Sequence, residues 1–192
     1  MARPKSEDKR KAILAAAVQV FAENGLSAAT LAVSRAAGVA EGTLFTYFAT
    51  KDELLNAVYR EIKQELAVVM MSGFPRKKSV RMRLKHVWDC FVDWGVANPA
   101  KRRVLAMLEV SSVLTTESKV AGAAPFAEIK PMVQEAIDQG IVSRGVPEEL
   151  IGGTMQALAA MTMDLMAAKK KAAEIFREKG FEVLWAGITK KG

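Results

Sequence analysis

Residues 30–51 read TLAVSRAAGVAEGTLFTYFATK, and this stretch predicts two short helices joined by a tight turn. Gly38 ends the first helix, because glycine adopts without penalty the left-handed conformation that closes many helices. The second helix begins at residues 40–43, and Leu44 and Phe48 recur at a spacing that buries one of its faces. The candidate inward positions of the first helix are Leu31, Val33 and Ala36. The whole stretch therefore predicts a helix-turn-helix.

A helix-turn-helix indicates DNA binding for a geometric reason. One helix braces against the DNA backbone while the second puts its first residues into the major groove, and the turn sets the angle between them. Basic side chains precede this stretch in the first eleven residues, at Arg3, Lys5, Lys9, Arg10 and Lys11. We therefore predict that double-stranded DNA is a partner of this chain.

The remaining sequence reads as helix after helix, without strand alternation or an internal repeat. Residues 50–53 (TKDE) read as a capping box that starts a long helix. Residues 115–124 are predicted to form a loop. The expected fold class is all-α with about nine helices, at residues 6–24, 30–38, 40–48, 51–72, 80–96, 100–114, 126–139, 147–168 and 175–188. We expect a DNA-binding domain at residues 1–51 and a ligand-binding and dimerisation domain at residues 52–192.

The helix predicted at residues 147–168 has almost no polar face before Lys169. A helix that is apolar all round buries both sides, so we expect one side in its own core and the other against a second subunit. Met163 is taken as a position on the outward side. Together with the last helix, this segment predicts a homodimer.

Composition narrows the function classes. The chain has 192 residues, 51% of them hydrophobic, and a net charge of +7, which favours a polyanionic partner. Cys90 and His86 are its single cysteine and single histidine, so an internal disulfide, a zinc cluster and a multi-histidine metal site are excluded. No hydrolase, metalloprotease or phosphate-loop motif is found, so we expect no enzyme and no cofactor. The absence of a signal-peptide pattern or a long apolar span predicts a cytoplasmic protein.

Residues 10–59 resemble the DNA-binding domain of the tetracycline-repressor (TetR) family. The resemblance lies in three motifs: IL-x-AA-x3-F-x3-G at residues 13–25, AAGVA-x-GTLF-x-YF at residues 36–48, and KDELL from Lys51. It covers roughly the first third of the chain. It implies a homodimeric transcriptional repressor that binds a palindromic operator and releases it when a small molecule binds the larger helical domain.

The resemblance also implies DNA contacts, position by position. Thr30 and Lys51 match phosphate-contacting positions at helix starts, Thr43 matches a contact residue of the recognition helix, and Tyr47 matches a groove or phosphate contact. The positions that face base edges are Glu41, Gly42 and Thr46.

Three residues depart from the family pattern. Phe45 stands where the family usually has tyrosine, so a phosphate hydrogen bond is missing, and Leu31 stands where a polar base-reading residue is common. Glu41 puts a negative charge beside DNA. Two interpretations of Glu41 stay open: it accepts a hydrogen bond from cytosine N4, or it is a surface acid that stabilises its helix N-terminus.

The second domain is predicted to bind a mainly apolar or aromatic effector. Ten methionines with interspersed aromatic residues suit an adaptable cavity, although core packing is the better explanation for each of them taken singly. The candidate lining residues are Met70, His86, Cys90, Trp94, Met107, Phe126 and Met161. The alternative function is a basic architectural DNA-binding protein without a ligand switch.

Overall fold

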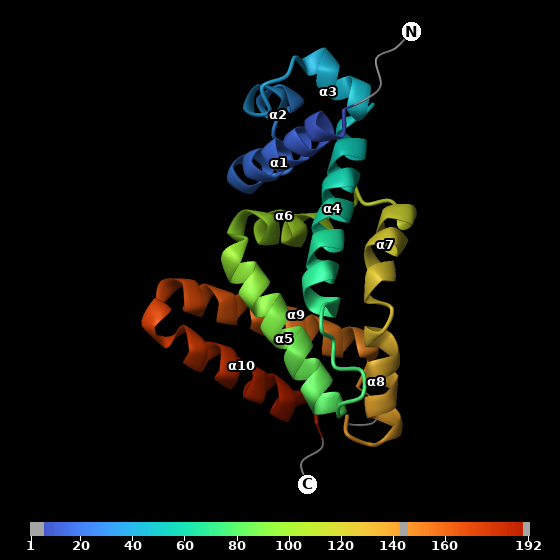
Figure 1. Cartoon of the computed structure of the whole chain (residues 1–192), viewed down its shortest axis with the longest axis vertical. Coiled ribbons are helices and arrows are strands. Elements are labelled where there is room, and N and C mark those ends of the chain that lie inside the picture. Colours follow the sequence, from blue (N-terminus) through green and yellow to red (C-terminus); the bar gives the residue numbers. More distant parts are fainter. Residues whose placement is uncertain (1–5, 143–145, 190–192) are drawn as a thin grey trace. The chain divides into compact units, whose positions relative to one another are not determined.

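The computed structural model describes residues 6–142 and 146–189, and the regular structure in these ranges is helical (Figure 1). Within them, the only strand-like pairing is one bridge between Val142 and Thr189. The all-α prediction is confirmed, and the described residues form ten α-helices in place of about nine. They are α1 (Glu7–Asn24), α2 (Thr30–Ala36), α3 (Glu41–Tyr47), α4 (Lys51–Met71), α5 (Val80–Ala97), α6 (Pro99–Glu109), α7 (Thr116–Ala123), α8 (Ile129–Asp138), α9 (Glu148–Ala168) and α10 (Ala173–Ile188). In the part of the chain described, no helix has the length and hydropathy needed to span a bilayer.

The chain divides into two compact units, and each unit is made from two separate stretches of sequence. The first unit comprises Met1–Glu65 and Asn98–Ala124, and the second comprises Leu66–Ala97 and Pro125–Gly192. Helix α4 therefore contributes residues to both units. The predicted division between residues 51 and 52 stays a prediction about where DNA binding ends and effector binding begins.

In the first unit, α1 packs against α2 and α6, and α2 packs against α3. Ile13 and Phe21 of α1 are fully buried with Val33 of α2. Leu44 and Phe48 are buried as predicted, so they fix one side of α3 in the core. Packing against the core therefore stabilises α3, because an isolated helix of seven residues is not stable in water.

Two of the three inward positions predicted for α2 are wrong. Val33 is buried as predicted, but Leu31 is 40% exposed and Ala36, the last residue of the helix, is exposed. Residues two positions apart on an α-helix point about 200° apart, so a helix that buries Val33 turns Leu31 outward. Ser34 takes the second inward position, and its hydroxyl donates to the carbonyl of Leu31 at 3.0 Å.

The prediction of a loop at residues 115–124 is wrong, because this stretch contains α7. The Thr115 hydroxyl caps this helix by accepting a hydrogen bond from the Ser118 backbone amide at 3.1 Å. The Ser118 hydroxyl is fully buried and accepts a hydrogen bond from Arg60 of α4 at 2.7 Å. Tertiary contacts therefore support a helix that the local sequence, with its threonines and glycine, does not favour.

A buried asparagine joins the segment before α7 to α4. The Asn56 side-chain amide donates to the carbonyl of Val113 at 2.9 Å, and its oxygen accepts from the Thr115 amide at 3.0 Å. Helix α7 also lies close to Tyr59, since a Cβ at Gly122 would come within 2.5 Å of the tyrosine ring. Glycine at this position is therefore required by the close approach of the two helices.

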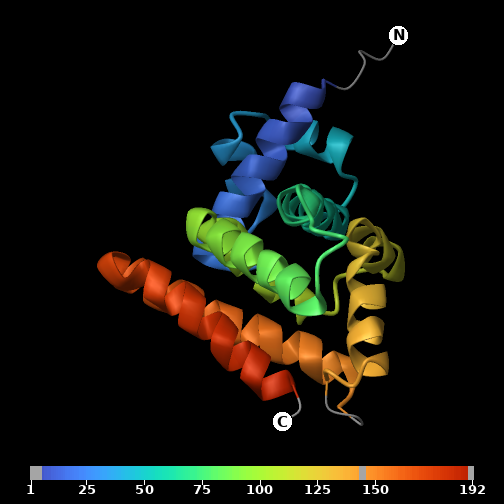
Figure 2. The same ribbon diagram turned by 60° about the horizontal axis from the view of Figure 1, so that its bottom comes forward.

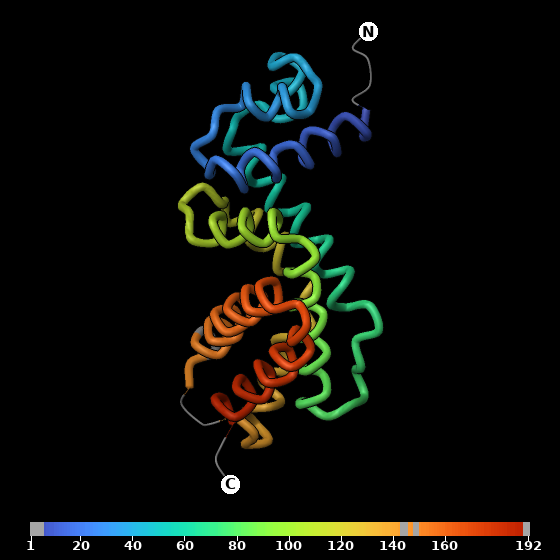
Figure 3. Tube along the Cα trace, turned by 90° about the vertical axis from the view of Figure 1, so that its left-hand side faces the viewer, coloured from blue at the N-terminus to red at the C-terminus, as the bar shows by residue number. Residues whose placement is uncertain are grey.

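The second unit is built from α5, α8, α9 and α10. Figures 2 and 3 show α9 and α10 lying side by side, and α5 packs against both. Trp88 of α5 is fully buried with Phe181 and Leu184 of α10, and its indole donates to the carbonyl of Arg177 at 2.9 Å. This tryptophan is the largest of the fully buried side chains described, so it is a central part of the core of this unit.

Gly180 lies within the last helix, at a point where α10 meets two other helices. Helix α10 is continuous through Gly180. A Cβ there would lie 2.7 Å from Thr162 Oγ1 of α9 and 2.7 Å from a ring carbon of Trp88. The glycine therefore lets three helices approach one another closely.

Helix α9 has one buried face and one exposed face. Met163 is 1% exposed, so its predicted outward position is wrong, and Thr162 and Met166 are buried beside it. Leu150 and Met161 are more than half exposed. Because every face of α9 is apolar, sequence alone does not tell which face packs inward; the contacts with α5 and α10 decide it.

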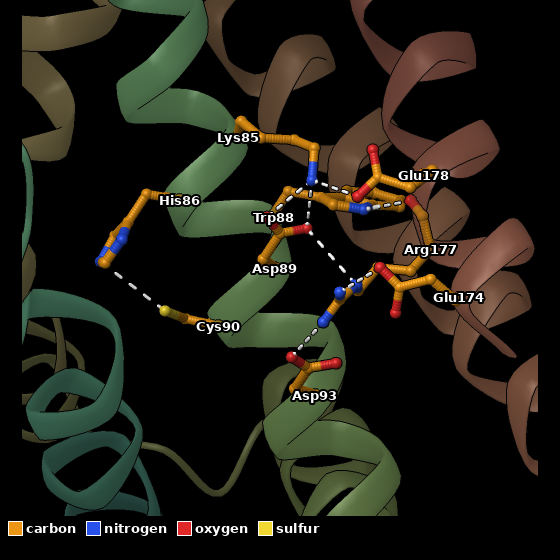
Figure 4. A network of polar contacts seen from close by, with 9 residues as sticks. All are labelled: Lys85, His86, Trp88, Asp89, Cys90, Asp93, Glu174, Arg177 and Glu178. Atoms are coloured by element: carbon orange, nitrogen blue, oxygen red, sulfur yellow. Dashed lines mark hydrogen bonds and ion pairs between the residues drawn. The ribbon is translucent and has the colours of Figure 1, made fainter. Parts of the chain in front are cut away.

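Ion pairs join α5 to α10 along the outside of this core (Figure 4). The Lys85 ammonium donates to Asp89 at 2.7 Å and to Glu178 of α10 at 2.8 Å. Arg177 of α10 donates to Asp93 of α5 at 2.7 Å. The hydrogen bond from Lys85 lowers the pKa of the Glu178 carboxyl below its ordinary value. Charged groups at this contact are therefore paired across the two helices.

Candidate nucleic-acid interface

The turn between α2 and α3 is closed by backbone hydrogen bonds around a left-handed glycine. Gly38 has φ 66°, as predicted for a helix-ending glycine. The Val39 amide donates to the carbonyl of Ser34 at 3.0 Å, and the Ala37 amide donates to the carbonyl of Val33 at 2.9 Å. These bonds satisfy the last carbonyls of α2, so the direction in which α3 leaves the turn is defined.

Helix α3 presents one side to solvent, since Leu44 and Phe48 are buried on the other. Gly42, Phe45 and Thr46 are exposed. The predicted contact residues Glu41, Thr43 and Tyr47 are partly exposed. All five of the predicted DNA contacts on this helix are therefore reachable from outside, and its exposed N-terminus carries the partial positive charge that favours phosphate.

A hydrogen bond joins the first residues of α2 and α3. The Thr30 hydroxyl donates to Glu41 Oε1 at 3.0 Å. Neither interpretation of Glu41 from the sequence included this bond. One carboxylate oxygen of Glu41 is thus already bonded within the protein. This hydrogen bond joins the first residue of α2 to the first residue of α3, and both residues are predicted DNA contacts.

Two other contacts position the ends of α3. The Tyr47 hydroxyl accepts a hydrogen bond from the Ser6 backbone amide at 2.8 Å, which ties the start of α1 to α3. The Thr46 hydroxyl donates to the carbonyl of Gly42, four residues earlier in the same helix, at 2.9 Å. The sequence did not indicate the first of these bonds, because residues 6 and 47 are far apart along the chain.

Lys51 is the first residue of α4 and is partly exposed. The predicted capping box is present next to it: the Thr50 hydroxyl accepts from the Glu53 amide at 3.0 Å. The Glu53 carboxylate reaches back to the Ala49 amide at 2.7 Å, one residue earlier than the simple motif predicts. The ammonium of Lys51 therefore stands at a rigid helix start.

Of the basic residues near the N-terminus, Arg3 and Lys5 lie outside the described residues. Lys9 and Lys11 are exposed on α1. Arg10 lies 3.6 Å from the Glu7 carboxylate and 5.8 Å from the centre of the Phe48 ring. Arg10 is therefore partly neutralised and packed within the protein, so Lys9 and Lys11 are the better phosphate candidates on this helix.

Three of the predicted effector-lining residues lie together in the second unit. His86 Nε2 is 2.9 Å from the carbonyl of Met70 and 3.6 Å from Cys90 Sγ. Because a carbonyl only accepts, Nε2 carries the hydrogen of this bond. Phe74, which the prediction omitted, packs its ring edge-on against His86 at 5.9 Å. Figure 4 shows His86 and Cys90 pointing away from α10.

The other four predicted lining residues are dispersed. Trp94 is buried and Phe126 is partly exposed, both in the second unit, while Met107 belongs to the first unit. Met161 is 53% exposed on α9, so most of its side chain faces away from the core of this unit.

The second unit also buries one basic residue. Arg83 of α5 is 9% exposed and donates to Glu135 of α8 at 2.6 Å. This hydrogen bond lowers the pKa of the Glu135 carboxyl. The guanidinium charge is therefore matched inside the protein, which agrees with a unit whose interior is mainly apolar.

This arrangement defines a helix-turn-helix protein with a second, all-helical unit. Residues 13–58 match the sequence model of the tetR family of bacterial regulatory proteins. The chain is 33% identical over 84 residues to the uncharacterised HTH-type transcriptional regulator YhgD of Bacillus subtilis, a match covering 41% of this chain and 44% of that protein. The match thus spans less than half the length of that relative.

Two solved structures extend the likeness to the whole fold. A TetR-family transcription regulator of Marinobacter aquaeolei VT8 has a TM-score of 0.84 at 22% identity, over 96% of this chain and 97% of that one. The regulator FadR of Bacillus subtilis, solved in complex with stearoyl-CoA, has a TM-score of 0.70 at 20% identity, over 93% and 99%. Residues 13–58 therefore carry the sequence match to the tetR family, and the chain as a whole shares the fold of TetR-family regulators.

Proposed function

We propose that this chain is a ligand-responsive transcriptional repressor that binds a palindromic operator as a homodimer. The observation that carries the proposal is the exposed side of α3, where Gly42, Thr46 and the partly exposed Thr43 lie within the region that matches the family. Selection of bound sequences from a random duplex pool tests it. We expect an inverted repeat, bound about a thousandfold more tightly than unrelated duplexes.

Lys51 is proposed to contact a phosphate and Thr43 to fix the register of α3 on the DNA. Lys51→Ala should weaken binding to all sequences alike and lower the slope of log affinity against log salt by about one unit. Lys119→Ala is the matched control, because Lys119 is an exposed lysine of α7 in the same unit. Thr43→Ala should cost about 1 kcal/mol of binding free energy. An unchanged salt slope for Lys51→Ala contradicts the phosphate contact.

For Glu41, base recognition and helix stabilisation both remain open, and one substitution separates them. Glu41→Gln removes the charge but keeps the oxygen that accepts from Thr30, so the α2–α3 hydrogen bond is preserved. Under base recognition, the preference for one C·G pair in each half-site relaxes, by about 1–3 kcal/mol. Nonspecific binding tightens under both interpretations, and under helix stabilisation the preference profile stays unaltered.

The homodimer is proposed to form through the exposed faces of α9 and α10. Support comes from their apolar residues: Leu150 and Met161 of α9 and Ile175 and Val183 of α10 are all more than half exposed. Met161→Lys should produce monomers in sedimentation and weaken operator binding, because a single half-site is held weakly. Val110→Lys is the control at an exposed valine of the first unit. A wild-type chain that sediments as a monomer at micromolar concentration refutes this interface.

The effector is proposed to be a small, mainly apolar molecule bound in the second unit near Met70, His86 and Cys90. FadR of Bacillus subtilis was solved with stearoyl-CoA, whose acyl chain is apolar, and this supports the proposal. Calorimetry with stearic acid, stearoyl-CoA and free coenzyme A tests it. The acyl compounds should bind with a negative heat-capacity change and release the operator. Equal binding of free coenzyme A contradicts a mainly apolar effector.

The second candidate is a basic architectural DNA-binding protein, and the net charge of +7 favours it. Such a protein binds unrelated duplexes with similar affinity and does not respond to an effector. The operator selection therefore also decides between the two functions. In either case the chain acts where the genome lies, so the cytoplasm stays its predicted location.

A further inference from the structure

Two apolar side chains are exposed on the helix-turn-helix. Leu31 of α2 is 40% exposed and Phe45 of α3 is 41% exposed. Leu31 directly follows Thr30, and Phe45 lies about one helical turn after Glu41, so they flank the hydrogen-bonded pair that joins the two helices. Isolated exposed apolar residues are ordinary on a protein surface. The position of these two, within the proposed DNA-contacting surface, requires a specific explanation.

The setting of Phe45 favours contact with base edges. It lies on the exposed side of α3 between Gly42, three residues earlier, and Thr46. A Cβ built at Gly42 would meet nothing within 4 Å, so this side of the helix is bare of protein. A glycine lets the backbone approach DNA closely, which brings the neighbouring ring within reach of the groove floor.

The chemistry of the two side chains restricts what they recognise. Neither has a donor or an acceptor, so neither forms a hydrogen bond with a phosphate or with a polar base edge. The major groove offers one apolar feature that depends on sequence, the 5-methyl group of thymine. We infer that Leu31 and Phe45 each contact a thymine methyl group in the major groove, and so select A·T pairs within each half-site. This inference rests on the proposed operator binding.

The direct test changes the DNA and leaves the protein unaltered. With the operator selected from the random pool, each thymine of one half-site is replaced in turn by deoxyuridine, which lacks only the methyl group. Replacement at a contacted thymine should weaken binding of the full chain about fourfold, the equivalent of exposing one buried methyl group. Replacement at the other thymines should leave the affinity unchanged. A profile without any sensitive thymine overturns the inference.

Single variants then assign each methyl group to a side chain. Phe45→Ala should abolish the effect of deoxyuridine at one thymine and Leu31→Ala at another, while each leaves the remaining thymine sensitive. Phe45→Tyr retains the ring and should retain the effect. Val110→Ala is the matched control, because Val110 is an exposed apolar residue of the first unit outside α2 and α3. Sensitivity that persists in both alanine variants also overturns the inference.

The outcomes separate this inference from the proposed function. A chain that selects an inverted repeat but shows no thymine-methyl dependence is still a sequence-specific DNA-binding protein, and only the inference fails. A chain that selects no sequence refutes the proposed function and the inference together. Because the variants change exposed residues, their circular dichroism spectra and melting temperatures should match those of the wild type.

Discussion

Two helices, α7 in the first unit and α10 in the second, are fastened to their neighbours by different chemistry. Helix α7 is joined to α4 through a buried asparagine and a buried serine, Asn56 and Ser118. Helix α10 is joined to α5 by one hydrogen bond, from the buried Trp88 indole to the Arg177 carbonyl, and otherwise by ion pairs that are partly exposed, such as Lys85 with Glu178. Hydrogen bonds to buried neutral groups are expensive to break, whereas partly exposed ion pairs each contribute little and respond to salt.

This difference indicates which of the two helix contacts can rearrange at a low cost in free energy. The unit that carries the helix-turn-helix is held by directional bonds that fix one geometry. The unit proposed to bind an effector has, at its α5–α10 contact, pairs that exchange partners or open at modest cost. Four predictions test the contrast, in order of decreasing effect.

Asn56→Leu should give the largest loss. The substitution removes the hydrogen bonds that Asn56 makes with the Thr115 amide and the Val113 carbonyl. The loss of both should lower the free energy of unfolding by about 3 kcal/mol. Asn24→Ala is the matched control, because the side chain of that exposed asparagine donates to the Val20 carbonyl of its own helix at 3.2 Å and so joins no second helix through this bond. Urea unfolding followed by circular dichroism measures both. Equal effects of the two changes would refute the contrast.

Gly180→Ala should follow, at about 2 kcal/mol, because its Cβ would overlap Trp88 and Thr162. The same change at Gly187, which has no neighbouring atom within 4 Å, should be neutral or stabilise α10 by up to about 1 kcal/mol. Thermal unfolding of both variants is the measurement. A neutral Gly180→Ala would mean that the three helices shift apart freely.

Arg177→Met should cost about 1 kcal/mol at low salt, since the pairs it removes are partly exposed. The backbone carbonyl that accepts from Trp88 is retained, so the substitution leaves that hydrogen bond in place. In 1 M salt the wild type should approach the variant, because exposed charges are screened there. If the wild type stays more stable than Arg177→Met in high salt, the effect comes from packing and not from charge.

The smallest expected effect is the pH dependence of the stability that Glu178 contributes. Lys85 lowers the folded-state pKa of Glu178, so this carboxylate stabilises the protein above its unfolded pKa of about 4.3. That contribution is lost as the pH falls through the lowered folded pKa. Glu178→Gln should therefore be slightly less stable than the wild type at pH 7, and the gap should close in acid. Urea midpoints measured from pH 7 to pH 3 give the result.

The helix-turn-helix was predictable because its signals are local. A left-handed glycine at residue 38 and two apolar residues four positions apart are read directly from the sequence, and the structure has Leu44 and Phe48 buried and Gly38 at φ 66°. The same local reasoning failed for Leu31. In a helix of seven residues the apolar pattern is too short to define a face, so packing against α1 and α3 decided it.

Helix α7 and the orientation of α9 could not be predicted from the sequence, for a different reason. Residues 115–124 contain threonine, serine and glycine, and their helix depends on distant partners in α4, namely Asn56, Tyr59 and Arg60. An asparagine within the apolar stripe of α4 was the available signal. In α9 the uniform apolar character hid which side is inward, so Met163 was assigned to the wrong face.

The surroundings of the single cysteine have a practical consequence. Burial raises the pKa of the Cys90 thiol, and the carboxylates of Asp89 and Asp93 raise it further. Since the thiolate is the reactive form, Cys90 should react slowly with maleimides and disulfide reagents at pH 7. A cysteine introduced at Val110, which is 87% exposed, should then take up a spin label or fluorophore selectively. The native chain thus serves as its own background for distance measurements, without removal of Cys90.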